Sequence, residues 1–179
     1  ANVWVQDNAV FLYLGSSESY DENADLLKLG ALRIEFSKNP FSEGGSFSQF
    51  LDLEQGRIMI SGKSPENSVE IALWHDMKDG TLYMDAETSA DARCKVSFIS
   101  WRTKPDSVRL DNWDIMNKTA YVQPDVIDFQ DDHVLWYHQN DNGKLLFNQI
   151  HHLQKFTELS NTVQPFNRDL IFGGLVMGK

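Results

Sequence analysis

The chain has 179 residues, of which 41% are hydrophobic and 23% charged, and its formal net charge is -10. This composition is typical of one folded globular domain and excludes a mainly disordered chain. The excess of acidic side chains repels phosphate and so argues against nucleic-acid and anionic-membrane partners. No apolar run approaches the roughly 20 residues that a membrane-spanning helix needs, and we predict one domain over residues 1–179.

Both ends of the chain read as apolar strands. Residues 3–5 form a strand-like run, and the last eight residues are FGGLVMGK. Domains usually end in exposed polar segments. We therefore expect this chain to be a piece of a longer protein, or a domain whose terminal strands pair with each other or with a neighbour.

The first sixty residues predict strands separated by turns. Residues 3–5 and 10–14 form a hairpin signal, and residues 29–36 alternate polar and apolar side chains. The polar stretch 16–28 predicts a long loop or one helical turn. Residues 47–53 and 57–61 flank Gly56, which is typical of a second hairpin.

Residues 67–102 show the clearest period-two pattern in the chain. Apolar side chains alternate along 69–73, 82–86 and 94–98, and Asp79-Gly80 supplies a tight turn between the first two runs. We predict a three-stranded antiparallel meander here. Cys94 is the chain's single cysteine, so no intrachain disulfide can form, and its place in the third run predicts a buried, inert thiol.

The pattern weakens after residue 102. Residues 110–121 predict an irregular or helical excursion, and 124–129 and 133–139 predict two strands. A strong turn at 140–143 precedes 145–152, which fits either a strand or a helix. A terminal strand follows the tail that begins at Asn161. About ten or more strands and little helix indicate an all-β fold, a large antiparallel β-sandwich.

Carboxylate clusters are the first candidates for chemistry, because glycoside hydrolysis requires two carboxyl groups around one bond. No cluster has a spacing that demands catalysis, and 26 acidic residues produce clusters by chance in solvated loops. We therefore predict no catalytic residue. The clusters are Asp21 with Glu22 and Asp25, Asp111 with Asp114, and Asp131 with Asp132.

The five histidines do not predict a metal site, because none has the ligand spacing of a known metal motif. His133 and His138 lie five residues apart, so in one strand they point to opposite faces. No nucleophile elbow or phosphate-binding glycine pattern is present. We predict neither a metal nor a cofactor.

Aromatic clusters are the better candidates for binding, because exposed rings stack on sugars while neighbouring polar groups bond to hydroxyls. The alternative is that these rings fill the core of the sandwich. The candidate carbohydrate-binding residues are Trp136, Tyr137, His138, Asn140, Trp101 and Arg102.

Several segments together resemble the N-terminal domain of bacterial glycoside-hydrolase-like proteins known as domain of unknown function 5703. That group is related in architecture to family 95 alpha-L-fucosidases. The matching segments are ANVWVQ, LYLGSSESYDENADLLKLGALRIEF, SFISWRT, HVLWYHQN and NRDLIFGGLVMG. A glycine-rich leader that precedes the first segment in similar domains is absent here.

The resemblance implies a β-supersandwich of the galactose-mutarotase type that packs on a helical toroid carrying the catalytic acids. It implies a secreted or periplasmic protein, a non-catalytic role for this domain, and an oligo- or polysaccharide as its possible ligand. Residues 16–25 or 136–140 would then line a sugar pocket. The alternatives are a free-standing glycan-binding module, or a small lyase or hydrolase with two acids or a His–Tyr pair in one cleft.

Overall fold

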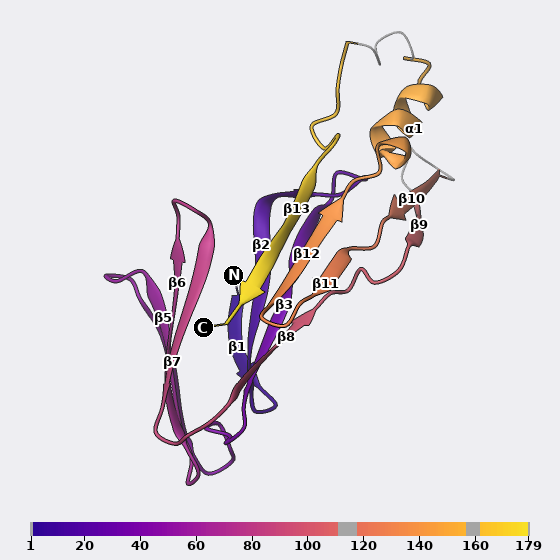
Figure 1. Cartoon of the computed structure of the whole chain (residues 1–179). Coiled ribbons are helices and arrows are strands. Elements are labelled where there is room, and N and C mark those ends of the chain that lie inside the picture. Colours follow the sequence, from indigo (N-terminus) through magenta and orange to yellow (C-terminus); the bar gives the residue numbers. More distant parts are fainter. Residues whose placement is uncertain (1, 111–117, 157–161, 179) are drawn as a thin grey trace. The chain divides into compact units, whose positions relative to one another are not determined.

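The computed structural model describes residues 2–110, 118–156 and 162–178. Figure 1 shows that most of its regular elements are strands. The described residues also form the short helix α1 and the 3-10 helix η1, Asn142–Lys144. The strands form four sheets, ordered β1-β2-β3-β8, β4-β5-β6-β7, β10-β9 and β11-β12-β13. The predicted all-β sandwich class is confirmed.

The elements have the following bounds: β1 Asn2–Gln6, β2 Ala9–Tyr20, β3 Leu26–Phe36, β4 Ser46–Asp52, β5 Arg57–Lys63, β6 Ser68–Asp76, β7 Thr81–Thr88, β8 Cys94–Ile99, β9 Asp106–Leu110, β10 Lys118–Val122, β11 Val126–Phe129, β12 His133–Gln139, α1 Leu146–Leu153 and β13 Ile171–Met177.

The chain divides into two compact units, and the predicted single domain stays a prediction. One unit comprises Asn2–Leu12 and Leu32–Ser97 and contains the sheet β4-β5-β6-β7. The other comprises Tyr13–Ala31 and Phe98–Lys179 and contains β9 to β13 and α1.

Tight turns confirm the predicted hairpins of the first unit. Asp7 and Asn8 join β1 to β2 with φ angles of 49° and 64°, the left-handed conformation that two-residue hairpin turns require. Gly56 and Gly80 have φ angles of 64° and 74° in the turns of the next two hairpins. In the sheet β4-β5-β6-β7, alternate side chains are buried and form part of the core: Ile60, Val69, Ile71 and Leu73.

Two predictions for residues 16–102 were wrong in part. Strand β2 continues to Tyr20, so the loop spans only residues 21–25. Ser19 Oγ donates a 2.6 Å hydrogen bond to Leu27 O and so holds the end of β2 against β3. The predicted meander holds for β6 and β7, but β8 leaves that sheet and pairs beside β3. The backbone N–H of Ser37 donates to Arg93 O at 2.9 Å and anchors the chain just before β8 begins.

Cys94 is exposed, so the prediction of a buried thiol was wrong. The first three side chains of β8 are exposed, and Val96 is one of them. Partial burial of the sulfur still raises the pKa of the Cys94 thiol, which disfavours the reactive thiolate.

In the second unit, β9 and β10 pair where the sequence predicted an irregular or helical excursion over 110–121. The central residues 111–117 lie outside the described part. Residues 145–152, left open between strand and helix, are mainly the helix α1. None of the helices in the described ranges has the length and apolar character needed to cross a membrane.

Strands β11, β12 and β13 form the sheet that positions the candidate site (Figure 1). Because successive side chains alternate between the two faces of a strand, Trp136 and His138 share one face, which is buried. We call it the inner face. Trp136 packs on Phe98 there, with ring centroids 4.1 Å apart, and faces Gly174 of β13. A Cβ at position 174 would lie 2.5 Å from the indole ring, so glycine is needed.

Candidate functional site

His138 lies near the end of β12, on the inner face, and is 1% exposed. Its Nδ1 is 3.1 Å from Oδ1 of Asp125, and its Nε2 is 3.5 Å from Oε2 of Glu22. The ring of Phe172 stacks against the imidazole, with centroids 5.0 Å apart. Both ring nitrogens therefore face carboxylates in a site shielded from solvent.

Asp125, just before β11, connects His138 to Arg102. Its Oδ1 accepts a 2.7 Å hydrogen bond from Arg102 Nε, and its Oδ2 accepts a 2.8 Å bond from Ser100 Oγ. Arg102 also donates from Nη1 to Lys28 O at 2.8 Å. The buried carboxylate of Asp125 thus connects His138 of β12 to Ser100 and Arg102, which follow β8. Arg102 extends the connection to β3.

Glu22 connects the same network to the segment before α1. Its Oε1 accepts a 3.0 Å hydrogen bond from the backbone N–H of Asp141, and its carbonyl oxygen accepts one from the N–H of Leu146 at 2.9 Å. Among the described residues, its buried Oε2 accepts no hydrogen bond and has only the ion pair with His138. Glu22 therefore fixes the 21–25 loop against the end of β12.

The network contains four charged groups that stabilise each other's charged forms: Glu22, Asp125, His138 and Arg102. Burial raises the pKa of Glu22 and of Asp125, but interactions with His138 and other donors outweigh burial, so both pKa values lie below their ordinary range. Burial lowers the pKa of His138, but the two carboxylates outweigh it and raise that pKa to about 9. At neutral pH two positive and two negative charges compensate one another.

We expect the free energy of unfolding to fall by about 3 kcal/mol between pH 6 and pH 9 through His138 alone. The folded-state pKa is raised above its ordinary value of 6.5, so the contribution is full below pH 6.5 and is lost as the pH rises through about 9. The contributions of Glu22 and Asp125 have the opposite sign and are lost in acid, because their pKa values are lowered. Urea unfolding at several pH values measures the slope.

His138→Gln is the control for this slope. The variant is less stable than the natural chain, but its stability should change much less between pH 6 and pH 9. An equal slope in both proteins would mean that His138 is not protonated in the fold.

Side-chain amides hold the loops around this network in place. Asn140 donates from Nδ2 to Tyr20 O and to Asn167 O, both at 2.9 Å. Asn167 in turn donates to Asp21 O at 2.6 Å. Asn23 donates to Tyr121 O at 2.9 Å. The 21–25 loop is thereby tied to the ends of β10 and β12 and to the segment before β13.

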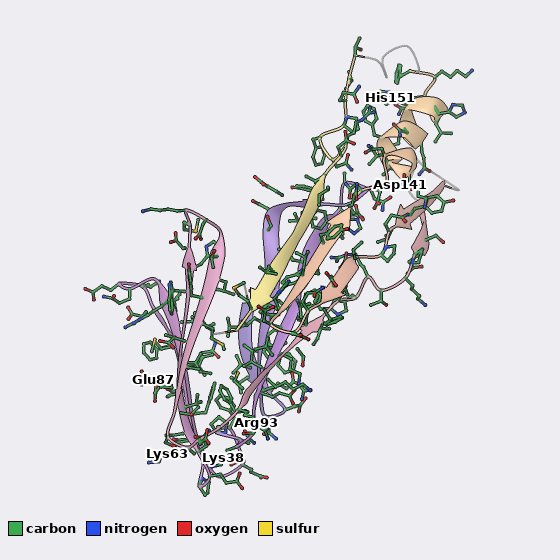
Figure 2. The ribbon with its side chains drawn as sticks, in the orientation of Figure 1. Lys38, Lys63, Glu87, Arg93, Asp141 and His151 are labelled. Carbon is green, nitrogen blue, oxygen red and sulfur yellow. The ribbon has the colours of Figure 1, made fainter. Side chains whose placement is uncertain are left out.

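Two hollows lie next to this network. We call the first the amide hollow; its volume is about 550 Å³, and Figure 2 labels one of its residues, Asp141, where the chain leaves β12. It is lined by Gln123, Pro124, Val126, Gln139, Asn140, Asp141 and Asn142. The second is an apolar groove of about 430 Å³ along α1, lined by Glu22, Asn23, Ala24, Leu146, Phe147, Ile150, Gln164, Pro165, Phe166 and Asn167.

The structure brings together three of the six predicted carbohydrate-binding residues. Arg102 and His138 share Asp125, and Asn140 lies two residues beyond His138 and lines the amide hollow. All three are largely buried.

The other three predicted residues are separated from this network. Trp136 is 3% exposed and belongs to the core. Tyr137 is half-buried on the opposite face of β12. Trp101 is 51% exposed and meets Tyr13 edge-on, with ring centroids 5.5 Å apart.

Glu22 and Asp125 are the residues that sequence reasoning missed. Glu22 was treated as one of several acids in a solvated loop, yet both Glu22 and Asp21 are buried. Their neighbour Asn23 is buried as well, but in the sequence these residues form only a polar stretch, which gives no sign of burial. Asp125 follows a proline and precedes a strand, which indicates a boundary and gives no hint of its partners.

The remaining acidic clusters give no site among the described residues. Asp131 and Asp132 are exposed, as expected for a solvated turn, whereas Asp111 and Asp114 lie outside the described residues. In the described ranges, no group of three or more histidine, cysteine, aspartate or glutamate side chains is arranged to hold a metal ion.

Comparison with known proteins gives one match. The model of a family described as domain of unknown function (DUF5703) matches residues 1–179. The chain belongs to this family. No curated protein and no solved structure matches it.

The buried network of this DUF5703 domain is arranged for structural support. His138 is enclosed, and a carboxylate faces each of its ring nitrogens. Beside this network the amide hollow presents the side-chain amides of Gln123 and Gln139, which can donate and accept hydrogen bonds.

Proposed function

We propose that this DUF5703 domain is the non-catalytic N-terminal domain of a secreted or periplasmic carbohydrate-active protein, related to family 95 alpha-L-fucosidases. Its role is to pack on a helical catalytic domain of the same polypeptide and to line part of the sugar pocket. The sequence resemblance suggests the parent protein, and the exposed face of the sheet β11-β12-β13 supports the packing.

Six apolar side chains cover that exposed face, which we call the apolar face. The strand register places five of them side by side, because each pairs with or lies two residues from another member. Ile171 pairs with Gln139 and is diagonal to Tyr137. All are exposed except Tyr137, which is half-buried. They are Val126, Leu135, Tyr137, Ile171, Leu175 and Met177.

A continuous apolar surface of this kind is costly in water. Antiparallel sheets with one solvated face normally alternate apolar and polar residues, whereas both faces of β13 carry apolar residues or glycine. Large exposed apolar patches mark interaction surfaces. The polar side chains on this face are few, and they include Asp128, His133 and Gln139. Packing against another domain would remove this surface from water.

Methionine oxidation tests the packing. Met177 on the apolar face is 58% exposed, and Met77 in the β6–β7 turn is 85% exposed. In the 179-residue chain, dilute peroxide should oxidise both at comparable rates. In the natural polypeptide that contains this domain, we expect Met177 to react at least tenfold more slowly than Met77, as measured by mass spectrometry of the peptides.

Met77 is the internal control, because it belongs to the other compact unit. If Met177 and Met77 react alike in the natural polypeptide, nothing covers the apolar face and the packing proposal is wrong. The same conclusion follows if the natural polypeptide has no further domain.

A second candidate function, a glycan-binding module, is favoured by one observation in the first unit. Trp74 and Tyr83 pair across β6 and β7 on the face opposite the core, and both are exposed. Their rings are nearly parallel, with centroids 5.4 Å apart. Arg57 pairs with Trp74 from β5, so a cation borders the rings. Exposed aromatic rings with a polar border can stack on a sugar.

A further inference from the structure

The amide hollow lies between two segments that leave neighbouring strands. Gln123 and Pro124 connect β10 to β11, and residues 139–142 run from the last residue of β12 to the turn before α1. The hydrogen bonds of Asn140 to Tyr20 and Asn167 fix one wall. The backbone N–H of Asp125 donates to Arg102 O and fixes the other. The hollow therefore has a preformed shape.

Its lining consists mainly of carboxamides. Gln123 and Gln139 supply both donors and acceptors, and Asn140 offers its Oδ1, whereas the amide of Asn142 is bonded to Asp169. Asp141 adds a carboxylate. The lining contains neither lysine nor arginine, and Lys144 beside it is compensated by Asp141, whose Oδ2 lies 3.6 Å from Nζ. A phosphate, sulfate or uronate would therefore meet no uncompensated positive charge there. Pro124 and Val126 add a small apolar area. A neutral polyol with one apolar face fits this chemistry.

Several of these groups are left without partners. The side-chain amides of Gln123 and Gln139 make no hydrogen bond to any other described residue. Asn140 is 5% exposed, and its Oδ1 has no donor among the described residues. An unsatisfied buried acceptor is unfavourable. The amides of Gln123 and Gln139 are therefore available to a ligand in this open hollow.

The hollow lies at one end of the apolar face. Val126 and Gln139 belong to both surfaces, because their side chains point to the exposed side of the sheet β11-β12-β13. A domain that packs on the apolar face would therefore also cover the hollow. Enclosure increases the fraction of a ligand that is buried, which small-molecule sites generally require.

We propose that the amide hollow binds one residue of an uncharged oligosaccharide, and that the domain covering the apolar face completes the site. This inference rests on the proposed function, because the open hollow alone offers only one side of the site. Gln123 and Gln139 donate to and accept from sugar hydroxyls, and Pro124 and Val126 contact the C–H face of the ring.

Isothermal titration calorimetry of the natural polypeptide tests the site. The probes are four neutral oligosaccharides, namely cellohexaose, maltohexaose, xylohexaose and mannohexaose, and one anionic oligosaccharide, hexagalacturonate. We expect at least one neutral probe to bind and hexagalacturonate not to bind. In the double variant Gln123→Ala/Gln139→Ala the Kd for that probe should rise tenfold or more, because two hydrogen bonds are lost.

Gln55→Ala is the matched control, since Gln55 is an exposed amide in the β4–β5 turn and should leave the Kd unchanged. The double variant should keep the thermal unfolding midpoint of the natural protein, because neither amide has a partner among the described residues. Tight binding of hexagalacturonate, failure of all four neutral probes, or an unchanged Kd in the double variant would overturn the inference.

Two further measurements separate this inference from its alternatives. Loss of binding in Trp74→Ala, with normal binding in the double variant, would place the sugar on the other sheet and overturn the inference. Protection of Met177 without sugar binding would refute the amide hollow and leave the packing proposal intact. An unprotected Met177 would refute the packing proposal itself.

Discussion

Asp125→Ala should lower the free energy of unfolding by about 3–5 kcal/mol, the typical cost of removing one partner from a buried ion pair. The Asp125 side chain is fully buried and accepts hydrogen bonds from Ser100 and Arg102 besides facing His138. Its removal leaves two cations with only Glu22 and a backbone carbonyl as partners. Urea unfolding at pH 7 measures the loss.

The chain provides a matched surface pair for comparison. Asp132 also contacts a histidine, His133, at 2.6 Å, but its side chain is 81% exposed. Asp132→Ala should change the free energy of unfolding far less than Asp125→Ala does, because exposed ion pairs contribute little. Equal losses in the two variants would mean that the Asp125 network is solvated and that its burial has been misjudged.

Trp136→Ala should lower the free energy of unfolding by about 3–5 kcal/mol, because it leaves a large cavity in the core. The indole of Trp136 stacks on Phe98 and occupies the space above Gly174. Strands β8, β12 and β13 all lose contacts when it is removed. Chemical denaturation with fluorescence or circular dichroism detection gives the value.

Trp101→Ala is the control, because Trp101 was predicted alongside Trp136 as a carbohydrate-binding residue but is half exposed. Its loss should cost about 1 kcal/mol or less, since surface substitutions have small effects. A mild effect of Trp136→Ala, comparable to that of Trp101→Ala, would contradict the position of Trp136 in the core.

The features of the fold that the sequence predicted correctly depend on residues that lie close together in the chain. Asp7-Asn8, Gly56 and Gly80 define three hairpins, because few residues adopt the positive φ angles that these turns contain. The alternation along β6 and β7 likewise places Ile71 and Leu73 in the core. These features depend on neighbours in sequence, so a single sequence reveals them.

The candidate site was predicted only in fragments. His138, Asn140 and Arg102 were selected as polar neighbours of aromatic residues, with a sugar as their expected partner. Their observed partners are Asp125, Glu22 and backbone carbonyls as far away as Tyr20, 120 residues from Asn140. No local pattern encodes such pairing.

The sequence by itself determined the all-β class, the hairpins and the face on which most strand residues lie, because backbone turns and side-chain alternation are short-range properties. Only the tertiary structure decided that β8 leaves the sheet of β6 and β7, that Glu22 is buried, and that the apolar face is exposed. Those outcomes depend on which strands meet across long loops. The free energy of such contacts is shared among residues distant in the chain, and no single segment records it.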